Sequence, residues 1–428
     1  TTLSTPPLAG AGHLRLTSVP EGWQVGDSLV IAGTTPGTVQ NEVRQIRRIS
    51  GSVVYLNKAL TYDHIPAQSD FQVHIINTTR NVVIESESST TSRRGHVMFM
   101  HNRMVDIAYA SFFRLGRTDK LQPINDAVVD ANWQLQPGTG TNVRGRYAVH
   151  FHRNGLVNDG HPSVVRGSVV VNSPGWGFVN HSSYVDMIDN VAYGVRGAAF
   201  ATEVGDEIGS FHRNVAIGTI GSGEGTESRK RFQDYGNQGD GVWFQGSGIS
   251  VTHNVAAGNQ GNAFVYFTRG LVEGGVLQQF VSANLEDPQI ANGADKLPVG
   301  LVPILKFENN IGYASRTGLS AWYLLEGVTH DLQSVIANSD FWNNTVGIEL
   351  PYSRQIIVDN VRIVHAPSIS NGNGVMINAV TRDIVFRNLT VVGYSNGIVL
   401  PRRGYAIVDG GIFSNRRDIL IQTGLSAD

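Results

Sequence analysis

The phrase that decides the fold is DNVAYG at residues 189–194, which recurs as RNVAIG at 213–218 and as HNVAAG at 253–258. The asparagines of the first two copies lie 24 residues apart. Weaker copies stand at 309–312, 343–347, 359–361 and 387–389, and an earlier one begins at Arg80. A recurring unit of about 20–50 residues indicates a repeat architecture.

Each copy consists of a polar asparagine, a short β-branched run and a glycine, which is too short and too β-rich for a helical repeat. This pattern is typical of one coil of a parallel β-helix, whose coils stack about 4.8 Å apart. The sequence therefore predicts an all-β protein with a right-handed parallel β-helix over residues 80–428. We expect Asn190, Asn214 and Asn254 to occupy equivalent corners and to hydrogen bond as a ladder.

Residues 1–79 have a different pattern. Short alternating strands at 14–16, 28–32, 42–46 and 52–56 are separated by glycine- and proline-containing turns, which predicts a small antiparallel β-barrel or sandwich packed on the start of the β-helix.

Three segments interrupt the coils. Residues 117–145 and 219–240 are polar and rich in glycine, and residues 271–300 form a third excursion with expected helical character near 277–281. Long loops of a β-helix usually leave from one corner and wall a groove, and we expect segments 117–145 and 219–240 to wall the groove of the functional site.

Composition excludes several classes of protein. The net charge of −2 gives no overall field that would attract nucleic acid or an anionic membrane. The absence of cysteine excludes disulfides, thiolate catalysis and cysteine-ligated zinc. No 18-residue apolar run predicts a membrane span. Because the chain begins at Thr1, we expect a mature or trimmed chain that is secreted.

Histidines and acidic residues recur at the spacing of one coil. In a strand over 146–152, alternate residues share a face, so Tyr147, Val149 and Phe151 would point inward and His150 and His152 outward. His181 follows His152 by 29 residues, and the acidic turn at 203–207 comes about one coil later. We therefore expect these groups on adjacent rungs of one face.

This cluster suggests two kinds of chemistry. His150, His152 and His181 could bind a divalent metal, zinc or calcium, and no organic cofactor is expected. The expected catalytic acids, bases or nucleophile are Glu207, Glu203, Asp206 and His152. The alternative interpretation is a structural pair of surface histidines. Tyr235 and Trp243 could stack on sugar rings, although one of Trp243 and Phe244 should be core.

Several segments of the sequence resemble a known family. The carrying segments are 22–32 (GWQVGDSLVIA), 60–64, 80–84, 94–96, 115–120 (LGRTDK), 146–152 and 190–207. Over roughly residues 10–215, they resemble the cell-surface hyaluronidase and cell-migration-inducing hyaluronan-binding protein group, together with the fibrocystin-like proteins. The chain departs from the family at Gly197-Ala198, where Gly-His is frequent, and lacks the usual upstream glycine-rich β-domain; we expect a bacterial relative.

The resemblance implies an extracellular β-helix that acts on, or binds, an acidic glycosaminoglycan-like polysaccharide. Together with the register, it implies that Arg117, Asp119, Lys120 and His96 border the groove. A hydrolase and a lyase both remain open. The alternative is a non-catalytic glycan-binding or adhesion module, and a trimeric phage-tail-like β-helix is disfavoured by the N-terminal match. The sequence does not decide the oligomeric state.

Overall fold

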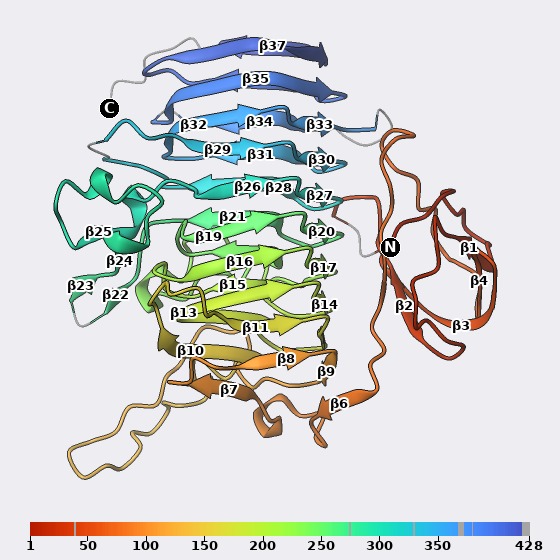
Figure 1. Cartoon of the computed structure of the whole chain (residues 1–428), viewed down its shortest axis with the longest axis horizontal. Helices are drawn as coiled ribbons and strands as arrows, with labels where there is room; N and C mark the ends of the chain where they lie inside the picture. Colours follow the sequence, from red (N-terminus) through yellow and green to blue (C-terminus); the bar gives the residue numbers. More distant parts are fainter. Residues whose placement is uncertain (38–39, 274, 328–329, 367–371, 379, 422–428) are drawn as a thin grey trace.

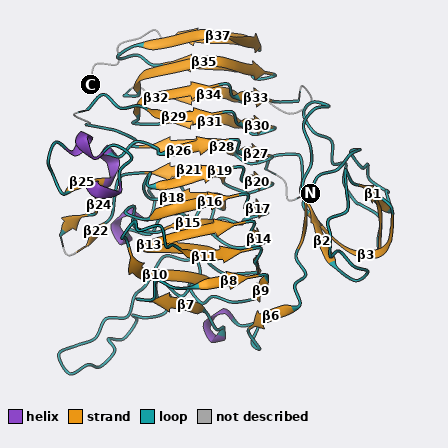
Figure 2. Ribbon diagram, viewed as in Figure 1, coloured by secondary structure: helices purple, strands orange, loops and turns teal. Residues whose placement is uncertain are grey.

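The computed structural model describes residues 1–37, 40–273, 275–327, 330–366, 372–378 and 380–421. Its main body is a stack of parallel coils (Figure 1), which confirms the predicted β-helix. Strands dominate the described residues, and the helical pieces are short 3-10 turns (Figure 2). Residues 422–428 of the predicted β-helix lie outside the described residues. Within the described ranges, no helix is long and apolar enough to cross a membrane.

The N-terminal part forms a five-stranded antiparallel sheet. In spatial order, its strands are β1 (His13–Arg15), β4 (Val53–Leu56), β3 (Glu42–Ser50), β2 (Ser28–Ile31) and β5 (Ile75–Asn77). Alternating apolar residues such as Leu14, Leu29 and Val54 fill its core.

Each coil contributes strands to three faces. The first face consists of β7 (Val97–Met100), β10 (Val149–Gly155), the first half of β13 (Phe178–Ile188), β15 (Ala198–Thr202), β18 (Asp240–Phe244), β21 (Asn262–Phe267), β28 (Thr317–Trp322), β31 (Val346–Leu350), β34 (Asn373–Ile377), β36 (Asn396–Leu400) and β38 (Arg417–Ile421).

The second face consists of β8 (Asp106–Ala108), β11 (Ser163–Arg166), the second half of β13, β16 (Ile208–His212), β19 (Ile249–Thr252), β26 (Lys306–Glu308), β29 (Ser334–Ala337), β32 (Arg354–Asp359) and the first parts of β35 (Arg382–Val392) and β37 (Ala406–Ser414).

The third face consists of β6 (Val82–Glu85), β9 (Ala110–Phe113), β12 (Val169–Val171), β14 (Val191–Tyr193), β17 (Val215–Ile217), β20 (Val255–Ala257), β27 (Ile311–Tyr313), β30 (Asp340–Trp342), β33 (Arg362–Val364) and the last parts of β35 and β37.

In-register stacking of apolar side chains builds the interior. Phe178 pairs with Phe200, and their rings stack 5.2 Å apart. The same column continues through Val242 and Phe264 to Leu319, all buried. Burial of such columns is the dominant stabilising contribution of the fold.

The predicted asparagine ladder is confirmed. The Oδ1 atom of Asn214 accepts from the backbone N and Nδ2 of Asn190, at 3.0 and 3.1 Å. The same pair of bonds links Asn214 to Asn254 and then Asn254 to Asn310. The buried polar groups of this corner thus satisfy one another from coil to coil.

The weaker copies do not all continue this ladder. Asn360 and Asn388 have φ angles of 50°. The residues that precede the ladder asparagines also have positive φ angles, for example 54° at Arg213 and 59° at His253. Asn360 and Asn388 therefore lie one residue before the ladder position. Asparagine suits this place as well, because it is one of the residue types that tolerate the left-handed region.

The N-terminal sheet lies along the third face (Figure 1). Asn41 Nδ2 donates to the carbonyl of Gly258 at 3.0 Å, and Asn343 Nδ2 donates to the carbonyl of Thr34 at 2.9 Å. Arg80 Nε reaches the carbonyl of Gly167 at 2.7 Å. These contacts attach one small sheet to several separate coils.

Contrary to our expectation, the three excursions do not leave the stack at one corner. Residues 114–148 and 218–239 connect the third face to the first, whereas residues 268–305 connect the first face to the second. The first face is therefore bordered by long loops on both edges. The predicted helix at 277–281 is wrong, because these residues belong to short antiparallel strands.

The turn between β6 and β7 contains the 3-10 helix η1 (Thr91–Arg93), and the second excursion contains η2 (Lys230–Phe232). The third excursion contains β22 (Val272–Glu273), β23 (Val276–Leu277), β24 (Gln279–Val281), η3 (Ser282–Asn284), η4 (Pro288–Ala291), β25 (Lys296–Pro298) and η5 (Val299–Leu301).

Candidate functional site

The first face brings the predicted histidines and Glu203 together. In the parallel register, His152 pairs with His181. Glu203 comes directly after β15 on the next coil, and its backbone N donates to the carbonyl of Asn180. Val149 and Phe151 point into the interior core, so the intervening histidines point outward, as the alternation of a strand requires.

Glu203 is a buried carboxylate with several partners. Tyr147 Oη donates to Oε1 at 3.0 Å, and His181 Nδ1 lies 2.9 Å from Oε2. His150 Nε2 lies 3.4 Å from the same Oε2 atom. Burial raises the pKa of Glu203, but the neighbouring imidazoles of His150 and His181 bring it well below its ordinary value. Glu203 is thus an anion at neutral pH.

The three histidines present suitable atoms for a metal ion. One ring nitrogen from each of His150, His152 and His181 lies within 4.8 Å of the others. His150 Nδ1 lies 2.8 Å from the carbonyl oxygen of Gly145; because a carbonyl only accepts, this nitrogen carries the proton. In the neutral ring, Nε2 of His150 then has a lone pair.

Two of these ring nitrogens are buried without a hydrogen-bond partner: His150 Nε2 and His152 Nδ1. Burial and the neighbouring His181 and His150 lower the pKa of His152 to about 4, so this ring is neutral at pH 7. In its neutral form, His181 donates Nδ1–H to Glu203 and has a lone pair on Nε2; because Glu203 raises the pKa of His181, a metal ion would have to displace the Nε2 proton. A carboxylate behind a ligating histidine is a common support of zinc sites, so the residues fit a divalent cation.

Glu207 organises the turn that carries Glu203. Its carboxylate accepts from the backbone N of Ser182, Glu203, Val204 and Gly205, at 3.3, 3.1, 2.8 and 2.7 Å. Burial and the charge of Asp206 raise the pKa of Glu207 to about 7. The neighbouring Asp206 accepts from Ser182 Oγ at 2.9 Å. Both carboxylates, which we expected as acid or base, are thus engaged within the turn.

A pocket of about 230 Å³ opens onto this cluster, and we call it the histidine pocket. It is lined by Arg144, Arg153, His181, Glu203, Val204, Gln233, Leu271, Val272 and Gln278. Each of the three excursions contributes to this lining. Two arginines give the walls positive charge above the anionic Glu203.

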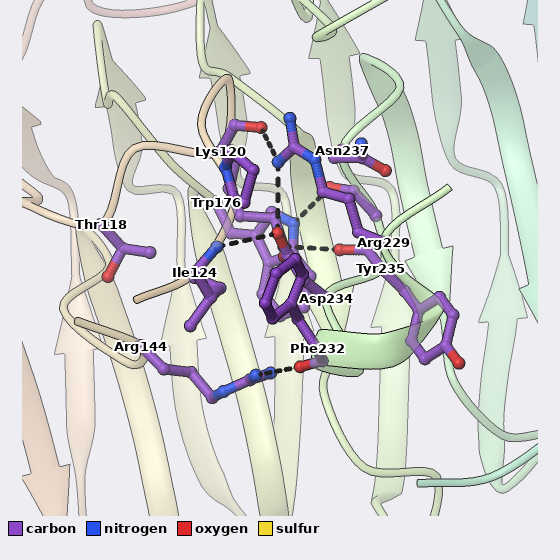
Figure 3. Close-up of polar contacts among 12 residues, drawn as sticks. Thr118, Lys120, Ile124, Arg144, Trp176, Arg229, Phe232, Asp234, Tyr235 and Asn237 are labelled. Atoms are coloured by element: carbon purple, nitrogen blue, oxygen red, sulfur yellow. Dashed lines mark hydrogen bonds and ion pairs between the residues drawn. The ribbon is translucent and has the colours of Figure 1, made fainter. Parts of the chain in front are cut away.

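A buried ion cluster, which we call the latch, joins two of the excursions (Figure 3). Lys120 Nζ pairs with Asp234 and lies 4.4 Å from the ring centroid of Trp176. Arg229 pairs with Asp234 at 3.2 Å and donates to the carbonyls of Lys120, Leu121 and Gln122. Lys120 is 1% exposed, so the structure places it inside the latch rather than at the border of the pocket.

The latch fixes a residue of the histidine pocket. Arg144 donates to the carbonyls of Phe232 and Gln233, at 2.7 and 2.9 Å (Figure 3). These carbonyls belong to the segment that Asp234 anchors. The position of the Arg144 guanidinium therefore depends on the latch.

The remaining predicted residues do not line the histidine pocket. Tyr235 and Trp243 are buried and stack on each other beneath the second excursion. Trp243 points outward, and Phe244 belongs to the interior core. Ala198, where the family often has histidine, packs in the same covered aromatic cluster.

Arg117 and Asp119 line a separate pocket of about 820 Å³ beside Asn125 and Phe232. His96 Nδ1 lies 3.4 Å from a guanidinium nitrogen of Arg117. The sequence reasoning missed Arg144 and Arg153. Arg144 lies in an aperiodic glycine-rich loop, where no spacing rule indicates the direction of a side chain.

Comparisons with known proteins agree with the resemblance. Residues 135–319 match the family model described as CEMIP beta-helix, so the predicted resemblance to this group is confirmed. A G8 domain-containing protein of Dictyostelium discoideum is 27% identical over 318 residues, which cover 71% of this chain and 24% of the relative. A second such protein from the same organism is 25% identical over 196 residues, covering 44% and 12%. The chain thus spans about a quarter or less of these relatives.

Solved structures with similar coordinates are remote. The catalytic domain of a GH87 alpha-1,3-glucanase in complex with nigerose aligns over 98% of this chain and 87% of that chain, with 14% identity and a TM-score of 0.35. The tailspike protein gp49 from Pseudomonas phage LKA1 aligns over 96% and 46%, with 12% identity and a TM-score of 0.21.

Proposed function

We propose that this chain, which carries a CEMIP β-helix match over residues 135–319, is a secreted enzyme that cleaves an acidic polysaccharide in the histidine pocket. The observation that carries the proposal is the combination at this pocket: the buried anionic Glu203 and His181 line it together with two arginines, and ring nitrogens of His150 and His152 lie within 4.8 Å of one on His181. Titratable groups with perturbed pKa values in a concave site favour catalysis over a purely structural role.

The pocket walls support an acidic substrate. Arg144 and Arg153 line the pocket, whereas the chain as a whole has a net charge of −2. Arg144 lies 3.6 Å from Asp126, which offsets part of its charge. The remaining positive charge is local and would attract a uronate carboxylate over a short range that salt screens. Arg144 is pre-positioned by two carbonyls, which lowers the entropy lost when a sugar carboxylate binds.

The three imidazoles would hold a divalent metal ion. Glu203 would orient His181 by accepting the hydrogen bond from Nδ1–H of that imidazole. When bound, a metal such as zinc supplies positive charge that can polarise a sugar oxygen or lower the pKa of water. Tyr147 fixes the other oxygen of Glu203, so the carboxylate cannot rotate away. His152, neutral at pH 7 because of its lowered pKa, can accept a proton where it does not ligate the ion.

The carboxylates indicate which reaction to expect. A two-carboxylate glycosidase needs an acid and a second carboxylate on opposite sides of the bond. Among the described residues that line the histidine pocket, Glu203 is the single carboxylate, and Glu207 is held by four backbone N–H groups. This arrangement favours imidazole-based elimination or metal-assisted hydrolysis over a carboxylate pair.

The alternative function is a glycan-binding module that uses the same pocket without turnover. One experiment separates the two. The protein is incubated with hyaluronan, chondroitin sulfate, alginate and polygalacturonate, while reducing ends and the absorbance of an unsaturated product are followed. New reducing ends without absorbance indicate hydrolysis, both signals indicate elimination, and binding without either signal supports the module.

Variants then assign the site. His152→Ala and Glu203→Gln should each abolish turnover. The matched control is His161→Ala, because His161 is exposed and lies outside the cluster; it should cleave like the parent. Full activity of the His152 variant would assign the cluster a structural role.

A further inference from the structure

Two tyrosines on consecutive coils form an aromatic platform beyond the histidine pocket. Tyr323 follows β28 and Tyr352 follows β31, and the backbone N of Tyr323 donates to the carbonyl of Pro351. Their rings stack with centroids 4.9 Å apart and planes 12° from parallel. Tyr352 remains 37% exposed. A partly exposed aromatic face is a surface on which the C–H face of a sugar ring can pack.

The platform lines its own pocket of about 420 Å³, which we call the tyrosine pocket. Its lining is Thr268, Arg269, Leu277, Pro298, Gly300, Leu301, Tyr323, Glu326 and Tyr352. Leu277 lines this pocket and the next residue, Gln278, lines the histidine pocket. The two pockets therefore meet consecutive residues of the third excursion, at the end of β23.

The coil geometry gives the separation along the stack. Glu203 follows β15 and Tyr323 follows β28, and the pairing runs from β15 through β18 and β21 to β28. Three steps of about 4.8 Å place the two positions about 14 Å apart along the helix axis. A short oligosaccharide spans such a distance, so one polysaccharide chain can reach both pockets.

The positive charge of Arg269 in the tyrosine pocket is already paired, and Glu326 adds a carboxylate to the lining. Arg269 forms an ion pair of 2.7 Å with Glu227, and Tyr323 Oη donates to Glu227 at 3.0 Å. The guanidinium carbon of Arg269 lies 5.1 Å from the centre of the Tyr323 ring. The internal pairing offsets the positive charge, so this surface selects a ring face rather than a carboxylate.

The backbone adds a second indication. Tyr323 and Tyr352 have φ angles of 61° and 55°, in the left-handed region that bulky residues rarely adopt. Asparagine adopts this backbone conformation with less strain, and it does so at Asn309 and Asn360. Strain of this sort at a bulky residue motivates a functional explanation.

We propose that the Tyr323–Tyr352 platform is a sugar-binding subsite for the same polysaccharide, about three coils from the site of cleavage. This inference rests on the proposed function. It implies that the protein prefers long chains, because a substrate must extend from the histidine pocket to the platform to gain the stacking contact.

The test compares long and short substrates with matched variants. Tyr352→Ala should raise KM about five- to tenfold on the polymer cleaved by the parent, which corresponds to the loss of one stacking contact. Its kcat, and its KM on the shortest oligosaccharide cleaved, should equal those of the parent. Tyr352→Phe should retain the parental KM, and the increase caused by Ala should persist in high salt because the contact is uncharged.

The control is Tyr62→Ala, since Tyr62 is 38% exposed on the N-terminal part of the chain and should leave KM unchanged. An unchanged KM for Tyr352→Ala, an equal increase on short substrates, or an Ala-like Phe variant would overturn the subsite. If the parent protein binds a polymer but does not cleave it, the catalytic proposal alone is refuted. The subsite is then tested by electrophoretic retardation in gels that contain each polymer, and equal retardation of the parent and Tyr352→Ala refutes it. A parent that is not retarded and does not cut refutes both.

Discussion

Asp234→Asn should open the latch. The side chain of Asp234 is completely buried and neutralises Lys120 and Arg229, which are 1% and 2% exposed. It also accepts from the backbone N of Ile124 at 3.3 Å. Arg229 keeps Glu224 and three carbonyls, whereas Lys120 loses its carboxylate. Leaving one buried charge without its partner costs about 3–5 kcal/mol.

Hydrogen exchange measures this loss locally. The interior core does not include the latch, so the coils should stay folded while residues 117–145 and 219–240 open more often. A loss of about 3–5 kcal/mol corresponds to amide protection lower by about 10²- to 10⁴-fold in these loops. Because the carbonyls that bind Arg144 move with this segment, affinity for acidic polymers should fall in parallel.

A double variant tests the cause. Lys120→Met combined with Asp234→Asn removes the uncompensated ammonium group and should recover part of the protection. Asp189→Asn is the control, because Asp189 forms an exposed ion pair with Arg213 and should leave the exchange of the loops unchanged. The reasoning is refuted when Asp234→Asn exchanges like the parent, or when the double variant is as open as the sum of the two single variants.

Asn214→Ala removes the hydrogen bonds that the Asn190 N–H and the Met187 carbonyl make with this side chain. Because each buried group left without a partner costs about 1–3 kcal/mol, urea denaturation should show a free energy of unfolding lower by about 2–6 kcal/mol. The control Asn132→Ala, at an exposed position, should change it by almost nothing. In calorimetric titration, the parent should bind one Zn²⁺ per chain and His152→Ala none; binding by both contradicts the histidine site. Burial raises the pKa of Glu203, but the neighbouring imidazoles of His150 and His181 bring it well below 4.5. Burial lowers the pKa of His181, but Glu203 raises it above 6.5 overall. The pair therefore stabilises the fold fully between about pH 4.5 and 6.5, and less as Glu203 is protonated below this window or His181 deprotonated above it. The thermal midpoint lost in Glu203→Gln should be largest inside the window and smaller at about pH 8; a loss independent of pH would speak against this pair.

Local periodicity accounts for what could be predicted from the sequence. The spacing of Asn190, Asn214 and Asn254 places them on one corner, and strand alternation places His150 and His152 on one face. Both inferences need only the rise and pleat of a coil. The same logic fails at Asn360, because asparagine suits two neighbouring positions of the corner.

The packing of the excursions could not be predicted in this way. Lys120 and Asp234 lie 114 residues apart in the chain, and no repeat indicates that they meet. Their loops cover Trp243, which alternation places outward and an aromatic cluster then buries. The contact between Tyr323 and Tyr352 could not be predicted either. These residues become neighbours only through the register of two coils whose loops differ in length.

The N-terminal sheet changes how the stack can come apart. In a solenoid, each coil touches only its neighbours, so unfolding can start at an end and progress coil by coil. Here Asn41, Thr34 and Arg80 bridge to coils that do not touch one another. Loss of one of these coils therefore strains the attachments to the others, so the coils between Gly167 and Asn343 should unfold more cooperatively than the free coils of a simple solenoid.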